Sequence, residues 1–132
     1  DIARFDGETQ LAQFYGGIKT EKGIYGGQIS IADDDVGTIT PPRQGVMMAI
    51  SYGNNSAYPA HQNMAGLIWC DTGSSLTCAK LTSEGSSLSV GTSDLTVAAG
   101  VDGDINIAAI SGTIQIKNRV GSTIEIWYNF IA

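Results

Sequence analysis

The sequence predicts an all-β protein, an antiparallel, jelly-roll-like β-sandwich of about eight to ten short strands. Three observations lead to this fold class. From residue 28 onward, apolar and polar residues alternate with a period of two, which is typical of strands. Turn signals rich in Gly, Asp, Asn and Pro recur about every 8 to 12 residues. The nearest helical candidate, residues 8–15, is stopped at once by Gly16 and Gly17.

The strands of the first half follow from this alternation. Residues 28–31 alternate between polar and apolar, and residues 46–52 place Val, Met and Ile on one side of a strand. Residues 65–70 form an uninterrupted apolar run, which is typical of a strand covered on both faces. We therefore expect Trp69, inside that run, to lie in the core.

The second half shows the same pattern with shorter strands. They are expected at residues 76–81, 88–90, 95–97, 105–107, 114–116 and 124–130. In the last of them Trp127 falls on the opposite side from Ile126 and Tyr128. One face of this strand is therefore an aromatic-rich surface, or it is covered by another subunit.

The chain is long enough for one domain with its own core, and its N-terminal part differs from the rest. Residues 1–25 carry Phe5, Phe14, Tyr15 and Tyr25 among Gly and charges, without a clean period. Two interpretations stay open: an arm that packs on a neighbouring subunit, or an irregular first strand of the same sandwich. The regular sandwich is expected over residues 26–132.

The composition excludes several functions. Seven Lys and Arg stand against 13 Asp and Glu, a net charge of −6, so we expect no cationic face for nucleic acid. A single His excludes a His-rich zinc site, and no apolar run approaches the roughly 18 residues of a membrane span. No acid/base carboxylate pair or nucleophile–base motif is recognisable, so we expect neither enzyme activity nor a cofactor.

Three stretches carry a resemblance to a known group of proteins. Residues 31–45 combine an acidic turn, a short strand, a Thr-Pro-Pro step and a Gly before the apolar strand at 46–52. Residues 65–75 and 114–122 continue the pattern. The chain from about residue 26 to its end resembles small all-β domains in structural proteins of tailed bacteriophages, among fibre-like and head- or tail-associated products.

This resemblance implies a non-enzymatic structural protein of a virion, assembled in the host cytoplasm. Such a protein decorates or cements a capsid, or forms a fibre or tail module. The implied partners are other copies of the chain, most often in a homotrimer, and virion proteins such as the major capsid protein. The alternative is a carbohydrate- or receptor-binding β-sandwich module at a fibre tip.

Cys70 and Cys78 are predicted to face each other across a hairpin. If residues 73–75 form a three-residue loop, residues 70 and 78 pair, and their sulfurs lie on the same side of neighbouring strands. A cross-strand disulfide and two buried free thiols both fit this arrangement. Assembly in a reducing cytosol favours the free thiols.

The acidic groups at 33–35 and 102–104 allow two interpretations. Clustered carboxylates on loops are the ligands that Ca²⁺ prefers, but no Glu follows at the distance that a calcium-binding helix–loop–helix motif requires. Asp side chains also bond to nearby backbone amides in turns. We expect this turn and cap chemistry, and no bound metal.

The remaining candidates are expected at an interface. The long polar loop between the strands at 46–52 and 65–70 carries Tyr58 and His61, which suit a protein contact, a sugar platform or a solvated loop. Arg43 and Arg119 are cations on loops, suited to an interface ion pair or to solvent. Trp127 completes the set.

Overall fold

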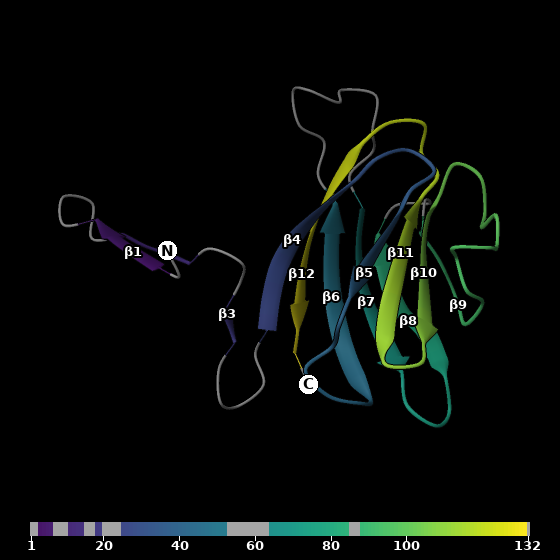
Figure 1. Cartoon of the computed structure of the whole chain (residues 1–132), viewed down its shortest axis with the longest axis horizontal. Coiled ribbons are helices and arrows are strands. Elements are labelled where there is room, and N and C mark those ends of the chain that lie inside the picture. Colours follow the sequence, from purple (N-terminus) through teal and green to yellow (C-terminus); the bar gives the residue numbers. More distant parts are fainter. Residues whose placement is uncertain are drawn as a thin grey trace.

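A computed structural model describes residues 3–6, 11–14, 18–19, 25–52, 64–84 and 88–131, with side chains described in 25–51, 64–83 and 88–131. Within these ranges the chain forms strands and turns, and no helix occurs. Figure 1 shows two sheets packed face to face. The all-β sandwich expected from the sequence is confirmed.

The two sheets are unequal in width. The wider one has the order β3(Ile18–Lys19), β4(Tyr25–Ile31), β12(Ile124–Phe130), β6(Val46–Tyr52), β7(Met64–Asp71) and β8(Thr77–Glu84). The narrower one has the order β5(Val36–Ile39), β11(Thr113–Asn118), β10(Ile105–Ile110) and β9(Leu88–Gly91). The strand pairs of both sheets are antiparallel except β9 and β10, which pair parallel.

The chain passes from one sheet to the other several times. It crosses between β4 and β5, returns at β6, crosses again between β8 and β9, and returns from β11 to β12. These crossings give the jelly-roll-like layering. They also place β12 between β4 and β6, although both of these strands lie far from β12 in the sequence.

The core lies between the sheets and is built from the inward-facing half of each strand. Ile126 and Phe130 of β12 are fully buried, as are Met48 and Ile68 of the neighbouring β6 and β7. Ile107 and Ile116 of the narrower sheet face them. Because side chains alternate across a strand, this burial fixes the register of each strand.

The strand expected at residues 95–97 is absent, because a capped turn takes its place. The Asp94 carboxylate accepts hydrogen bonds from the backbone N–H and hydroxyl of Thr96, at 2.9 and 2.7 Å. The Asp94 carbonyl accepts from the N–H of Val97 and of Ala98. Leu95 is buried whereas Val97 is 85% exposed, so the apparent alternation reflects one anchor residue within a turn.

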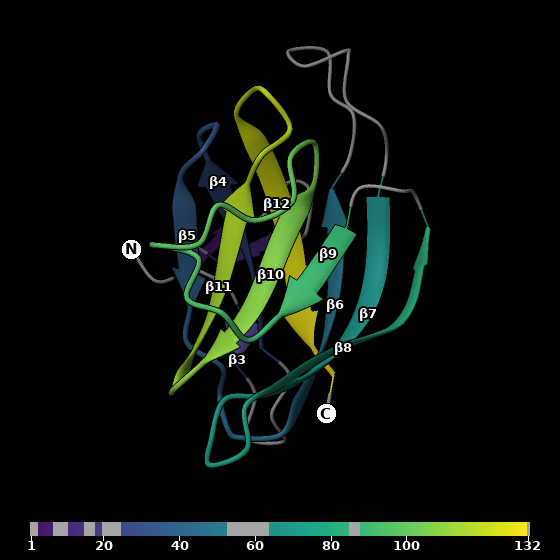
Figure 2. The ribbon, with the colours of Figure 1, turned by 90° about the vertical axis from the view of Figure 1, so that its right-hand side faces the viewer.

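Residues 92–104 cover the outer face of the narrower sheet. Figure 2 shows this segment running across the front of β10 and β11. The Lys117 ammonium of β11 donates to the carbonyls of Leu95 and Ala98, at 3.2 and 2.9 Å. The buried Gln115 amide oxygen accepts from the N–H of Leu95 at 2.7 Å. The narrower sheet is therefore packed on both sides.

Along β7 the outer face of the wider sheet is exposed, which corrects the prediction for residues 65–70. Burial alternates along β7, with Met64, Gly66, Ile68 and Cys70 inside. Trp69 points outward and is 37% exposed, so it is not a core residue. In this strand the apolar run therefore reflects one buried face and one exposed face whose side chains are also apolar.

The β1(Ala3–Asp6) and β2(Leu11–Phe14) strands form a hairpin of their own. They pair with each other in register, and neither joins the two larger sheets. In Figure 1 this hairpin stands apart from the sandwich. Of the first three strands, the short β3 is the one that joins a larger sheet, at its edge, where Ile18 pairs with Gly26 of β4.

Candidate functional site

The outer face of the wider sheet carries two exposed indoles. Trp127 of β12 pairs with Ser51 of β6, and Trp69 of β7 pairs with Met47 of β6. Trp127 is 41% exposed. The strand spacing puts the two Trp positions about 17 Å apart on one surface. A folded protein that leaves two Trp side chains on one sheet face has a surface suited to contact.

A groove of about 310 Å³ lies beside Trp127 and is lined by residues of β12, β6, β7 and β8. Its outward-facing floor is made of small side chains, Ala49 and Ala65, with Leu67 beside them. The indole of Trp127 lines it together with the amide of Asn129. Hydroxyl groups complete the lining, from Ser51, Thr82 and Ser83.

The groove is neutral. None of the residues that line it is charged, although the protein carries a net charge of −6. An uncharged, mainly apolar surface with several hydroxyls and one amide suits an uncharged partner. It does not suit a phosphate or a polyanion, which are recognised by cations.

A turn positions the second indole. Gly45, just before β6, has a φ of 61°, and a Cβ atom on it would lie 3.7 Å from Cζ2 of Trp69. The indole thus lies against the turn that leads into β6. A left-handed conformation favours Gly, so the sequence at this turn also shapes the exposed face.

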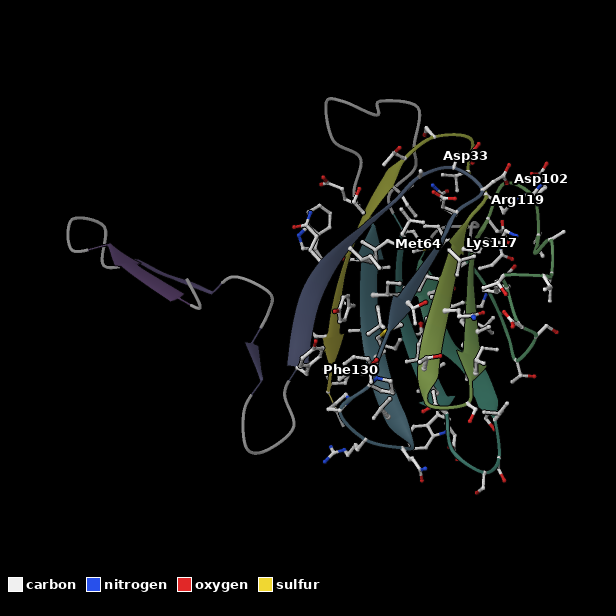
Figure 3. All side chains as sticks on the ribbon, viewed as in Figure 1. Asp33, Met64, Asp102, Lys117, Arg119 and Phe130 are labelled. Carbon is white, nitrogen blue, oxygen red and sulfur yellow. The ribbon has the colours of Figure 1, made fainter. Side chains whose placement is uncertain are left out.

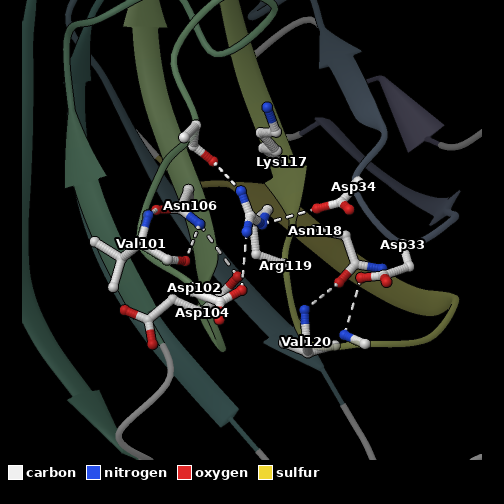
Figure 4. Close-up of polar contacts among 12 residues, drawn as sticks. Asp33, Asp34, Val101, Asp102, Asp104, Asn106, Lys117, Asn118, Arg119 and Val120 are labelled. Atoms are coloured by element: carbon white, nitrogen blue, oxygen red, sulfur yellow. Dashed lines mark hydrogen bonds and ion pairs between the residues drawn. The ribbon is translucent and has the colours of Figure 1, made fainter.

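A polar cluster occupies one end of the sandwich. Asp33, Asp102 and Arg119 gather there in Figure 3, away from Phe130 in the core. Arg119 Nε contacts Asp34 Oδ1 at 2.8 Å, and Arg119 Nη2 contacts Asp102 Oδ1 at 2.9 Å. Arg119 Nη1 donates to the carbonyl of Ala99 at 3.0 Å. Figure 4 shows these contacts joining three loops.

Asn118 is the buried member of this cluster. Its side-chain amide donates to the carbonyls of Ile31 and Ser122, at 2.9 and 2.6 Å. Its side-chain oxygen accepts from the N–H of Val120 at 3.0 Å. The side chain is fully buried, so these bonds satisfy its own polar atoms, which water does not reach.

Four of the five acidic residues singled out from the sequence have a side-chain partner, and Asp35 bonds through its backbone. Asp33 Oδ1 accepts from the N–H of Gly121, Asp34 adopts a left-handed φ of 63°, and Asp104 accepts from the hydroxyl of Ser89. Among the residues with described positions, no group of three or more His, Cys, Asp or Glu side chains could hold a metal ion. The geometry assigns these carboxylates to joining loops.

Cys70 and Cys78 are opposite each other, as the hairpin spacing predicted. The register pairs Cys70 with Cys78 and Asp71 with Thr77, around a loop in which the Gly73 N–H donates to Asp71. The two sulfurs are free thiols 3.8 Å apart. Cys70 is buried and Cys78 is half-buried.

Of the other interface candidates, five have no described side chain and two have one. Phe5 and Phe14 lie in β1 and β2, of which the backbone is described, and Tyr15, Tyr58 and His61 lie outside the described residues. Tyr25 begins β4, and its ring packs 5.9 Å from that of Phe130. Arg43 is exposed in the turn before β6.

Sequence reasoning found Trp127 but missed the surface around it. Alternation places Trp127 and Trp69 on definite sides of their own strands, but the pairing of β12 with β6 decides that both share one face. The small residues of the groove carry no sequence signal, since Ala and Ser in a strand read as ordinary alternation.

The comparisons with known proteins give no relatives. No protein-family model, curated protein or solved structure matches this chain. In the described part of the chain, no helix is long and apolar enough to cross a membrane.

Proposed function

We propose that this protein is a non-enzymatic association module that buries the outer face of its wider sheet against a second protein surface. One observation carries the proposal. The chain covers the outer face of its narrower sheet with residues 92–104, yet it leaves Trp69 and Trp127 exposed on the wider sheet.

The energetics favour contact at this face. An aromatic side chain buries about 150–250 Å² at an interface, and apolar area contributes about 25 cal/mol per Å² before the costs of association. Trp is among the residues that most often dominate binding energy. Two exposed indoles on one face, one of which lines a neutral groove, therefore supply the anchors that a protein contact uses.

The resemblance to tailed-phage structural proteins suggests where such contacts form. A virion is built from many copies that bind one another, so a small rigid β-sandwich acts there as a cement or as a fibre or tail module. The partners are then further copies of the chain, in a trimer, and other virion proteins such as the major capsid protein. The separate β1–β2 hairpin supports this proposal, because an element without sheet partners in its own sandwich is free to pair elsewhere.

A single substitution tests the association face. Trp127→Ser removes an exposed indole, so we expect self-association, or binding to particles that lack the protein, to weaken at least tenfold, which corresponds to about 1.4 kcal/mol. Sedimentation across a concentration series measures the first, and co-sedimentation with particles the second. Val97→Ser, which removes an exposed apolar side chain from the covered side, is the matched control.

These measurements can contradict the proposal in two ways. A wild-type protein that stays monomeric and ignores such particles contradicts the proposal. Equal association by Trp127→Ser and wild type moves the interface away from this face. Far-UV circular dichroism confirms that both variants keep the fold.

The groove favours a second candidate, a carbohydrate-binding module. An indole, an amide and three hydroxyls around a neutral groove can stack on a sugar ring and bond to its hydroxyls. In that case a monomeric wild type changes its Trp fluorescence on titration with neutral oligosaccharides. Trp127→Ser then abolishes the response.

A further inference from the structure

We propose that Cys70 and Cys78 are a redox pair that closes to a cross-strand disulfide when a peroxide or a small-molecule disulfide reaches the protein. The bond would lock the β7–β8 hairpin, which forms the edge of the wider sheet that carries the association face.

The backbone already holds the two cysteines in position. They are directly opposite in an antiparallel pair, in which Cα atoms lie about 4.5–5.5 Å apart, inside the range of about 4.4–6.8 Å found across disulfides. The sulfurs are 3.8 Å apart, and a bond requires about 2.05 Å. Small side-chain rotations close this gap without a change in strand pairing.

The surroundings of Cys78 suit a reactive thiol. Its sulfur lies between the sheets, where the thiol contacts the carbonyl of Ile107 at 3.7 Å. The hydrogen bond from Cys70 lowers the pKa of the Cys78 thiol; burial opposes this, and the N–H groups of Gly91 and Ala109 assist it. The thiolate is the form of Cys that attacks an oxidant.

Cys70 suits the second role, that of the resolving thiol. The hydrogen bond to Cys78 raises its pKa, and burial and the charge on Cys78 raise it further. The fully buried Cys70 is therefore kept protonated and away from solvent, while Cys78, on the edge strand β8, is only half-buried. The two thiols thus have different expected reactivities.

The chemistry balances with hydrogen peroxide as oxidant. The Cys78 thiolate attacks one peroxide oxygen, the O–O bond breaks, and the products are a sulfenic acid on Cys78 and, after protonation, water. The Cys70 sulfur then attacks the Cys78 sulfur, the S–O bond breaks, and a second water leaves with the proton from Cys70. Overall, two thiols lose two electrons and two protons, and one peroxide becomes two waters.

The disulfide would have a biological role in a virion component, and this role rests on the proposed function. Such a protein assembles with thiols reduced in a cytosol and meets oxidants only after release from the cell. The hairpin would then be free to adjust during assembly and would be locked afterwards. The disulfide chemistry itself does not depend on this role, and it is tested on the isolated chain.

Oxidation of the full-length folded protein tests the pair. After reduction and removal of the reductant, the protein is treated with hydrogen peroxide or glutathione disulfide. We expect a mass loss of two hydrogens, a peptide joining Cys70 to Cys78 under non-reducing conditions, and a melting temperature higher by several degrees. Dithiothreitol should reverse all three changes.

Two matched variants test the assigned roles. In Cys70→Ala, Cys78 should be trapped as a sulfenic acid or as a mixed disulfide with glutathione. In Cys78→Ala, the remaining Cys70 should react at least tenfold more slowly. Thiols in the folded wild type that stay unmodified by either oxidant, or a Cys70 that reacts as fast as Cys78, would overturn the proposal. Since the wild-type measurement needs no substitution, a variant that fails to fold leaves the test intact.

Discussion

At the scale of single residues, the polar end of the sandwich depends on Asn118. This side chain binds the carbonyls of Ile31 and Ser122 and the N–H of Val120, so it ties the turn after β4 to the turn before β12. Arg119, next along the chain, extends the connection to Asp34 and Asp102 through exposed ion pairs. Exposed pairs of this kind contribute little, so the buried amide carries most of the energy.

Asn118→Ala is expected to destabilise the protein strongly. The substitution removes three hydrogen bonds and leaves the buried Ile31 carbonyl without the Asn118 amide, at a cost of about 3 kcal/mol and a fall in melting temperature of about 10 °C. Urea unfolding measures the change. Gln28→Ala, on the exposed side of β4, should stay within about 0.5 kcal/mol of wild type. A loss at Asn118 no larger than this control would show that the network is dispensable.

At the scale of elements, residues 92–104 act as a cover that is held by polar anchors. Asp94 organises the turn at 94–98 and also accepts from the side-chain amide of Gln115 at 3.1 Å. Lys117 holds two carbonyls of the same segment. The cover therefore stays in place through hydrogen bonds from β11 as well as through the buried Leu95.

The cover is expected to loosen in acid. Hydrogen bonds from the side chain and N–H of Thr96, then from Gln115, lower the pKa of Asp94 below its usual value of 3.8. A carboxylate with a lowered pKa stabilises the fold above its unfolded pKa, and this contribution disappears as the pH falls through the folded value. Below about pH 4, wild type should therefore lose stability faster than Asp94→Asn, which has no charge to lose. Melting curves from pH 6 to pH 2 check this, and parallel curves for the two proteins would contradict it.

At the scale of the whole molecule, the outer faces of the two sheets differ in how far the chain covers them. The narrower sheet is covered by its own chain, whereas the wider sheet presents Trp69, Trp127 and a neutral groove. The β1–β2 hairpin adds a second element without sandwich partners. Among the described residues, this exposed face and this hairpin are the features suited to contacts between molecules.

Deletion of residues 1–17 should separate folding from association. The deletion removes β1 and β2, which pair with each other, and keeps β3 at the edge of β4. We expect a folded β-domain with a melting temperature within a few degrees of wild type but with weakened self-association. Circular dichroism and sedimentation measure the two properties. If the truncated chain cannot fold, the deleted segment is part of the core. If it folds and associates normally, the interpretation of this segment as an arm that packs on a neighbouring subunit is wrong.

Much of the fold could be predicted because it depends on local patterns. Alternation located β6, β10, β11 and β12, an uninterrupted apolar run located β7, and the loop at 73–75 set the pairing of Cys70 with Cys78. The strand predicted at 95–97 is absent for a local reason that alternation does not show. The Asp94 side chain hydrogen-bonds to the backbone that follows it, and this favours a turn over the backbone pairing of a strand.

The sequence by itself determined the fold class and, in most strands, which side chains share a side, because a period of two is a property of a single strand. Only the tertiary structure decided which strands are neighbours, since β12 finds its place between β4 and β6 through pairing across long stretches of chain. That pairing brings Trp127 and Trp69 onto one face and forms the groove beside Trp127. It also decided that an apolar run such as 65–70 is covered on one side and open on the other, because coverage depends on what packs above a strand.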